Sequence, residues 1–364
     1  MSTIINILLL ILMMGLIIAI HEFGHLVAAK IFNVYVSEYS IGMGPLICFK
    51  QYGETKYSLR AFPLGGFCAI AGDNDNDLEP SVDTTNIPYE RTLKGISPIK
   101  KIVVMLAGIF MNFILAWVIF SMVILSNGYY ATSSKPQIEA VVENSPAEAA
   151  GIMAGDIVEK AELPNGLSIT PDTYSELVSF LSAYDGNGAW KFRIDRDGTK
   201  VDIEVTPEFN IEEDRYLVGI SFSNAGTELV EMNIFNCFYY SLDYMKMLVK
   251  LMISSIVSMF TGRLGIDNLS GPVGIYSTVA ETVNLGFVYY IQLIAIISMN
   301  IGIMNALPLP IFDGGRVVIT LFEVIIGKPI SKKLESVIMT ASMVLLILLM
   351  IVVTYNDIGK VFGG

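Results

Sequence analysis

The sequence predicts a membrane α-helical protein with about four transmembrane helices, a membrane-associated β-hairpin region and one inserted α+β domain. Hydrophobic residues make up 53% of the 364 residues, more than is usual in a soluble domain. They are concentrated in four blocks, and each block approaches the roughly 20 apolar residues that a helix needs to cross a bilayer. These blocks comprise residues 4–32, 102–125, 285–307 and 336–354.

The first predicted transmembrane helix, residues 1–33, carries three ionisable side chains in its second half. No Lys or Arg precedes Lys30, and the apolar stretch is longer than that of a signal peptide, so we expect a retained span. His21, Glu22 and His25 interrupt the apolar stretch. An ionisable group at membrane depth is energetically unfavourable, so these residues indicate a functional site.

Residues 34–100 are predicted to form a cytoplasmic, membrane-associated β region followed by a loop. Short alternating runs flank Gly53-Glu54, a pattern typical of a β-hairpin. Gly65-Gly66 then interrupts regular structure. The apolar hairpin either dips into the bilayer or belongs to a small surface sheet, and the polar residues 72–86 are expected to form a solvated loop.

Basic residues next to the spans predict the orientation of the chain. One group precedes the second predicted transmembrane helix, residues 101–126, and another lies between the last two spans. Because basic residues favour the cytoplasmic side, both connections should be cytoplasmic, and both chain ends should lie outside together with residues 127–231. The two groups are Arg91, Lys94, Lys100 and Lys101, and Arg316, Lys328, Lys332 and Lys333.

Residues 127–231 have the character of an extracytoplasmic α+β domain. They contain 7 Lys or Arg and 19 Asp or Glu, an excess equal to the net charge of −12 of the whole chain. Because they show no basic stripe, we expect no nucleic-acid partner. Alternating apolar residues on both sides of Asp197-Gly198 predict a hairpin. The run IEAVVENSPAEAAGIMAGDIVEKAE resembles the PDZ pattern, and the alternative is a generic small domain.

The C-terminal part of the chain is predicted to hold one interfacial segment and two spans. Residues 232–284 are apolar but include Lys246 and Lys250, which favours an amphipathic helix at the membrane surface over a span. Residues 285–327 and 328–364 are predicted to form the third and fourth transmembrane helices.

The third span contains the run NALPLPIFDGG, whose prolines should break the helix. Pro308 and Pro310 free backbone groups at membrane depth, and such backbone is tolerated only where it is buried in protein or lines a wet cavity. Asn300 and Asn305 add polar side chains to the same span. The pattern therefore indicates a polar site within the membrane.

A zinc site is the best explanation for the polar residues of the first span. His21 and His25, the only two histidines in the chain, are four residues apart and project from one face of a helix. They can share a zinc ion, with Glu22 placed to take a proton from water. The alternative is a pair of interior histidines bonded to neighbouring groups. The third ligand must be a carboxylate or a thiol; Asp313 is the candidate, and its alternative role is a helix cap.

In these residues and their order, the chain resembles the bacterial site-2 protease family of intramembrane zinc metalloproteases. HEFGH matches the family motif H-E-x-x-H, and NALPLPIFDGG matches N-x-x-P-x-P-x-x-D-G. FPLGGF resembles the family's β region, LAGIFMNFILA its second span and GPVGI a further segment, with Ile109 where the family often has proline. The resemblance covers nearly the whole length and includes a single PDZ insert.

The resemblance implies one Zn²⁺ per chain, held by His21, His25 and Asp313, with Glu22 as the catalytic acid and base. The implied substrates are transmembrane segments of single-span proteins, such as anti-sigma factors, and remnant signal peptides, cut at the bacterial cytoplasmic membrane. The residues implied to contact substrate are Asn300, Asn305, Pro308 and Pro310.

Two other classes of function fit some of these residues. A divalent-metal transporter would also need intramembrane His and Asp, with Glu22 as a further ligand. Transport cores often contain internal repeats, and the sequence shows none. A PDZ-bearing membrane scaffold without catalytic activity is the second alternative, and the intact HEFGH and Asp313 argue against it.

Overall fold

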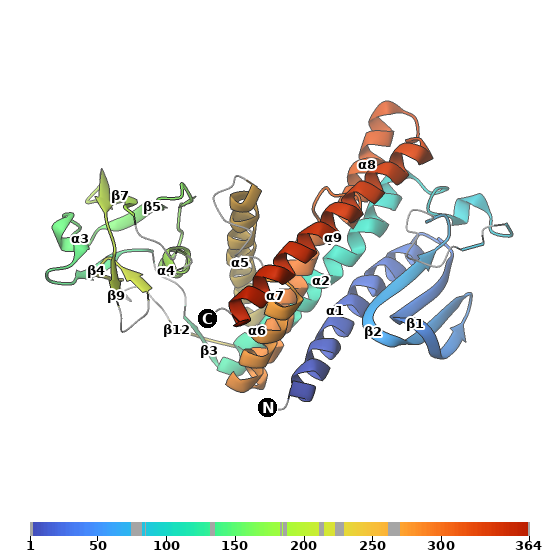
Figure 1. Ribbon diagram of the computed structural model, residues 1–364, viewed down its shortest axis with the longest axis horizontal. Coiled ribbons are helices and arrows are strands. Elements are labelled where there is room, and N and C mark those ends of the chain that lie inside the picture. Colours follow the sequence, from blue (N-terminus) through green and yellow to red (C-terminus); the bar gives the residue numbers. More distant parts are fainter. Residues whose placement is uncertain are drawn as a thin grey trace. The chain divides into compact units, whose positions relative to one another are not determined.

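The chain folds into two compact units, coloured along the sequence in Figure 1, which shows the computed structural model. The first unit comprises Met1–Val123 and Leu269–Gly364, and the second comprises Ile124–Asn268. The structure describes residues 3–73, 82–83, 85–131, 135–182, 184, 188–210, 215–222, 229–260 and 270–362. Part of the predicted loop 72–86 lies outside these residues.

Within the described residues, four helices are long and apolar enough to span a membrane, as the sequence predicts. The protein is therefore an integral membrane protein with a β region. The second of these helices begins three residues earlier than predicted, at Pro98, because proline is well tolerated in the first turn of a helix. The four spans are α1 (Thr3–Ile31), α2 (Pro98–Asn127), α7 (Phe287–Asn305) and residues Lys333–Gly359 of α9 (Lys332–Phe362).

The predicted third span is divided into two helices. Helix α7 ends at Asn305, and α8 (Asp313–Ile326) begins after a turn that holds the two prolines. With 14 residues, α8 is about 21 Å long, too short to cross a bilayer. A Cβ atom on Gly314 would lie 2.7 Å from the carbonyl oxygen of Leu307, so glycine is needed where α8 packs against the turn.

The β region is a long hairpin, β1 (Val36–Tyr52) and β2 (Thr55–Ile70), which turns at Gly53-Glu54 as predicted. The pairing of the two strands is interrupted by β-bulges, so that part of β1 pairs with two different parts of β2. Residues 36–41 pair with residues 66–70 on one side, and residues 38–41 pair with residues 56–59 on the other. Among the described strands, segment 66–70 therefore has one paired neighbour and forms one edge of the sheet, and β2 packs against α1 (Figure 1).

Charged groups fix the tip of this hairpin. Glu54 accepts hydrogen bonds from Lys30 at 2.8 Å and from Arg91 of η1 (Tyr89–Arg91) at 2.7 Å. Partial burial would raise the pKa of Glu54, but these hydrogen bonds and charges outweigh it and hold the pKa below its usual value. The ionised carboxylate thus ties the hairpin to the end of α1 and to the connection before α2.

The second unit is an α+β domain followed by a helix. Its main sheet has the order β6-β5-β7-β8, and Asp197 and Gly198 both have positive φ in the β7–β8 turn, which confirms the predicted hairpin. Buried residues of these strands and of α4 form one apolar core. The strands are β3 (Tyr129–Ala131), β4 (Ile138–Val141), β5 (Ile157–Glu162), β6 (Ser168–Ile169), β7 (Trp190–Arg196), β8 (Thr199–Val205), β9 (Glu208–Asn210), β10 (Arg215–Leu217), β11 (Ile220–Phe222) and β12 (Leu229–Glu231). The helices are α3 (Pro146–Ala149), α4 (Tyr174–Ser182) and α5 (Asn236–Phe260).

The predicted interfacial segment 232–284 contains two helices that belong to different units. Helix α5 lies in the second unit, where Lys250 forms ion pairs with Asp172 and Glu176. Helix α6 (Pro272–Leu285) lies in the first unit and packs against α1 and α7.

The N-terminus of α6 is closed by a carboxylate from α9. Asp357, which is buried, accepts hydrogen bonds from the backbone N–H groups of Gly271 at 2.9 Å and Gly274 at 2.8 Å. Unpaired N–H groups and the helix dipole favour an anion at this position. The glycines of GPVGI leave room for it, because a Cβ on Gly271 would lie 2.9 Å from Asp357 Oδ2.

Candidate metal centre

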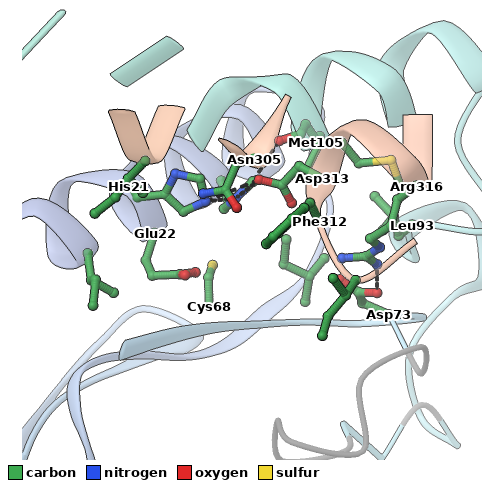
Figure 2. A pocket seen from close by; sticks show the side chains of 16 residues that line it. His21, Glu22, Cys68, Asp73, Leu93, Met105, Asn305, Phe312, Asp313 and Arg316 are labelled. Atoms are coloured by element: carbon green, nitrogen blue, oxygen red, sulfur yellow. Dashed lines mark hydrogen bonds and ion pairs between the residues drawn. The ribbon is translucent and has the colours of Figure 1, made fainter. Parts of the chain in front are cut away.

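The three predicted metal ligands meet in the first unit. His21 and His25 lie on one face of α1, and Asp313 is the first residue of α8. Asp313 Oδ2 lies 3.1 Å from Nε2 of His21 and 3.4 Å from Nε2 of His25, and the two Nε2 atoms are 3.3 Å apart (Figure 2). Phe312, and not Asp313, occupies the capping position of α8, and no side chain caps this helix. The Asp313 carboxylate faces the two histidines instead.

The donor set fits a zinc ion. Three ligand atoms at 2.0–2.1 Å from a tetrahedral zinc ion would be roughly 3.3 Å from one another, close to the three distances found here. Asp313 Oδ2 is buried, and within the described part of the chain it accepts no hydrogen bond, although the two imidazole nitrogens lie close to it. A buried anionic oxygen without a donor is unfavourable, and a cation between the three atoms would stabilise it. Cys68, a thiol on the cavity wall, is not part of this ligand group.

Close contact between α1 and α2 shapes the site. A Cβ atom on Gly24 would lie 2.9 Å from Cα of Gly108. In addition, Nδ1 of His25 is 2.8 Å from the carbonyl oxygen of Val104 in α2. This contact fixes the ring with Nε2 toward the ligand group. Small residues therefore allow α2 to lie directly behind both ligand histidines.

We expect Gly108→Ala to weaken zinc binding at least tenfold. This is the lower end of the roughly 10–100-fold loss of metal affinity that follows a change to residues that orient the metal ligands. The new Cβ would lie 2.7 Å from Cε1 and 2.8 Å from Nε2 of His21, and it would also collide with Nε2 of His25. Both rings would have to move. The measurement is competition for zinc with a chromogenic chelator. Gly359→Ala in α9 is the matched control, since nothing lies within 4 Å of its new Cβ; equal affinities of the two variants would contradict the expectation.

The ligand group lies on the wall of a cavity of about 240 Å³. Glu22 also lines the cavity, but its carboxylate is not one of the grouped ligand atoms (Figure 2). Asn305 also lines it, whereas Asn300, Pro308 and Pro310 are not among its lining residues. The structure thus brings five of the eight predicted site residues to one cavity: His21, Glu22, His25, Asn305 and Asp313.

The far end of this cavity holds an ion pair that the sequence analysis does not single out. Arg316 of α8 pairs with Asp73, which follows strand β2 (Figure 2). The two side chains are only 12% and 7% exposed. Arg316 is therefore largely buried, whereas the prediction of chain orientation counts it among the basic residues that face the cytoplasm. The pair joins the helix that carries Asp313 to the end of strand segment 66–70.

The site lies within the apolar part of the spans. Ten residues separate His21 from the end of α1, and ten separate Gly108 from the start of α2. Each interval corresponds to about 15 Å of helix. Both positions therefore lie well inside helices that are long and apolar enough to span a membrane.

Comparison with known proteins identifies the family. The model of Peptidase family M50 matches residues 9–349. The chain belongs to peptidase family M50. Membership confirms the resemblance to site-2 proteases and the predicted class of enzyme and cofactor, a zinc metalloprotease.

Relatives of this M50 peptidase match over nearly their full length. The chain is 34% identical to a protein named as a zinc metalloprotease from Clostridium acetobutylicum, with 97% of each chain covered. It is 28% identical to the regulator of sigma-W protease RasP of Bacillus subtilis, with 97% of this chain and 98% of RasP covered. It is 27% identical to the zinc metalloprotease RasP of Geobacillus kaustophilus, with 99% of each covered.

Proposed function

We propose that this M50 peptidase cuts transmembrane segments of single-span membrane proteins, remnant signal peptides, or both. The observation that carries the proposal is the meeting of His21, His25 and Asp313 between helices that are apolar enough to span a membrane, on a cavity that also holds Glu22. A relative named as regulator of sigma-W protease supports substrates of the anti-sigma-factor type.

We infer that His21, His25 and Asp313 hold the zinc ion. When bound, zinc lowers the pKa of water and polarises a carbonyl oxygen. Glu22 takes a proton from the attacking water as the water oxygen bonds to the peptide carbonyl carbon. Glu22 then gives this proton to the amide nitrogen as the C–N bond breaks, so each turnover restores its carboxylate.

We infer that strand segment 66–70, at the edge of this sheet, receives the substrate. A helical substrate hides its peptide carbonyls in backbone hydrogen bonds, so it must unwind before hydrolysis. An extended segment can add to an exposed strand edge through main-chain hydrogen bonds. Cys68 and Ile70 place this edge on the wall of the same cavity, and Asn305 can bond substrate backbone from the opposite helix.

The rival functions account less well for this site. In a transporter, Glu22 would be a metal ligand, but the group of ligand atoms found among the described residues does not include it. A scaffold has no need of a buried carboxylate oxygen directed at two imidazoles inside a membrane. A proton-transfer role for Glu22 is what separates the protease from both.

The first test is removal of the metal. We expect purified protein to contain one zinc per chain and to cleave a model single-span substrate. Stripping the metal with a chelator should reduce cleavage to background, because Glu22 alone does not activate water sufficiently, and zinc should restore it. Cleavage that persists in metal-free protein would contradict the proposal.

We further propose that residues 127–231 of the second unit form a PDZ-like domain on the outer side of the membrane that limits which substrates enter. Their α+β composition supports a small separate domain, and the basic residues that flank the spans at the other two connections support this placement. A domain of about 100 residues is roughly 26 Å across, twice its radius of gyration. Such a domain can exclude substrates with bulky outer domains and admit those trimmed to short tails.

Deletion of residues 127–231 tests this size filter. Strand β3 pairs with β12, and Tyr129 lies opposite Glu231, so a short Gly/Ser linker can bridge the gap. We expect the shortened protein still to cut a trimmed substrate and also to cut a long-tailed one that the full chain rejects. If the shortened protein binds zinc but no longer cuts the trimmed substrate, the domain is needed for productive binding and the filter idea is wrong.

A further inference from the structure

The face of α2 that meets α1 presents three residues at intervals of four. The carbonyl oxygen of Val104 lies 2.8 Å from Nδ1 of His25, and Gly108 leaves room for both imidazole rings. One turn further on, the side chain of Asn112 reaches the other ligand histidine, His21. Residues spaced in this way share one helix face, so one stripe of α2 serves both histidines.

Each ligand histidine needs a hydrogen-bond acceptor behind it. An imidazole that offers the lone pair of Nε2 to a metal carries its proton on Nδ1, and that N–H needs an acceptor to hold the ring in place. For His25 the acceptor is the backbone of Val104. For His21, the partner of Nδ1 found among the described residues is the side-chain amide of Asn112, at 3.3 Å.

The unpaired atom of Asn112 shows which end of the amide belongs there. Nδ2 faces Nδ1 of His21, while Oδ1 is buried and receives no hydrogen bond from the residues that the structure describes. The two ends of an amide are nearly equal in size, so a half-turn exchanges them in the same space. With Oδ1 facing the Nδ1–H of His21, the buried oxygen gains a donor and Nε2 is left for the metal.

Helix α7 fixes Asn112 from the other side. The hydroxyl of Ser298 donates a hydrogen bond to the backbone carbonyl of Asn112 at 3.0 Å, and both residues are completely buried. A Cβ on Gly302 would lie 3.4 Å from Cβ of Asn112, so the two helices are in close contact here. The amide is therefore held at the junction of α1, α2 and α7.

We propose that Asn112 is a positioning residue for the metal centre. Its side-chain oxygen accepts a hydrogen bond from Nδ1–H of His21 and holds the ring with Nε2 directed at the metal. The inference rests on the proposed zinc site at His21, His25 and Asp313. Asn112 acts through His21 and does not itself touch metal or substrate.

The test is zinc affinity, measured on the full chain in detergent by competition with a chromogenic chelator. Asn112→Leu keeps the approximate volume and removes the acceptor, and it should raise the apparent Kd for zinc by about 10–100-fold. Asn112→Asp keeps the acceptor, so its Kd should stay within about threefold of wild type. Asn6→Leu is the matched control, because Asn6 is also buried in a span with an unbonded Oδ1, and it should leave the Kd unchanged.

A packing role for Asn112 predicts the reverse order, since leucine would fill the space and a buried aspartate would not be tolerated. That order, or equal affinities for wild type and both variants, overturns the inference. If Asn112→Leu does not yield folded protein, Asn112→Asp decides: retained affinity supports an acceptor role, and a tenfold loss overturns it. Failure of the proposed zinc site would look different, because wild type itself would then bind no zinc in this titration.

Discussion

We expect Glu22→Gln to lower the turnover of a single-span substrate by about 10²–10⁴-fold, the range that a general acid–base group contributes. Glutamine has nearly the same shape as glutamate but cannot take a proton from water. Glu22 lines the cavity beside the ligand group without belonging to it, so the variant should still contain one zinc per chain. Turnover and zinc content, measured on the same purified sample, check both halves of this expectation.

Glu90→Gln provides the matched control for this variant. Glu90 lies in the exposed η1 turn, outside the cavity, so the same loss of one carboxylate should change neither turnover nor zinc. Loss of zinc from Glu22→Gln would make Glu22 a ligand and favour a transporter. Undiminished turnover would remove Glu22 from the proton-transfer step.

Local spacing accounts for the part of this site that the sequence could predict. His21 and His25 share a helix face whatever the rest of the fold does, because four residues make about one helical turn. The turn at Gly53-Glu54 and the helix break at Pro308 likewise depend on residues that are close in the sequence. Spans follow from composition alone, since a bilayer fixes their length.

The partners across helices could not be predicted in this way. Asn112 is an amide in an otherwise apolar span, a signal that could have drawn attention to it, but the sequence does not say that it faces His21, 91 residues away. Arg316 and Asp73 are 243 residues apart, and a count of basic residues treats Arg316 as exposed. The position of residues 66–70 at the edge of the sheet depends on bulges that move the register of the hairpin.

We expect Asp313→Asn to weaken zinc binding by more than about 100-fold and to eliminate cleavage. Changes to groups that merely orient a ligand already lower metal affinity by 10–100-fold, and loss of the anionic ligand should exceed that. The amide keeps the size of the carboxylate but lacks its charge, and Asp313 supplies the oxygen that lies within 3.4 Å of both imidazoles. Zinc affinity by chelator competition and cleavage of a single-span substrate are the two measurements.

Glu323→Gln separates loss of a ligand from loss of a charge on α8. Glu323 lies ten residues further along the same helix, where Oε1 accepts a hydrogen bond from the backbone N–H of Ile330 at 3.0 Å. Glutamine retains this acceptor, so the control variant should fold, bind zinc and cleave as wild type does. If Asp313→Asn keeps its zinc while Glu323→Gln loses it, Asp313 is not the third ligand. If both variants lose zinc equally, the charge of α8 matters and not the position of the Asp313 oxygen.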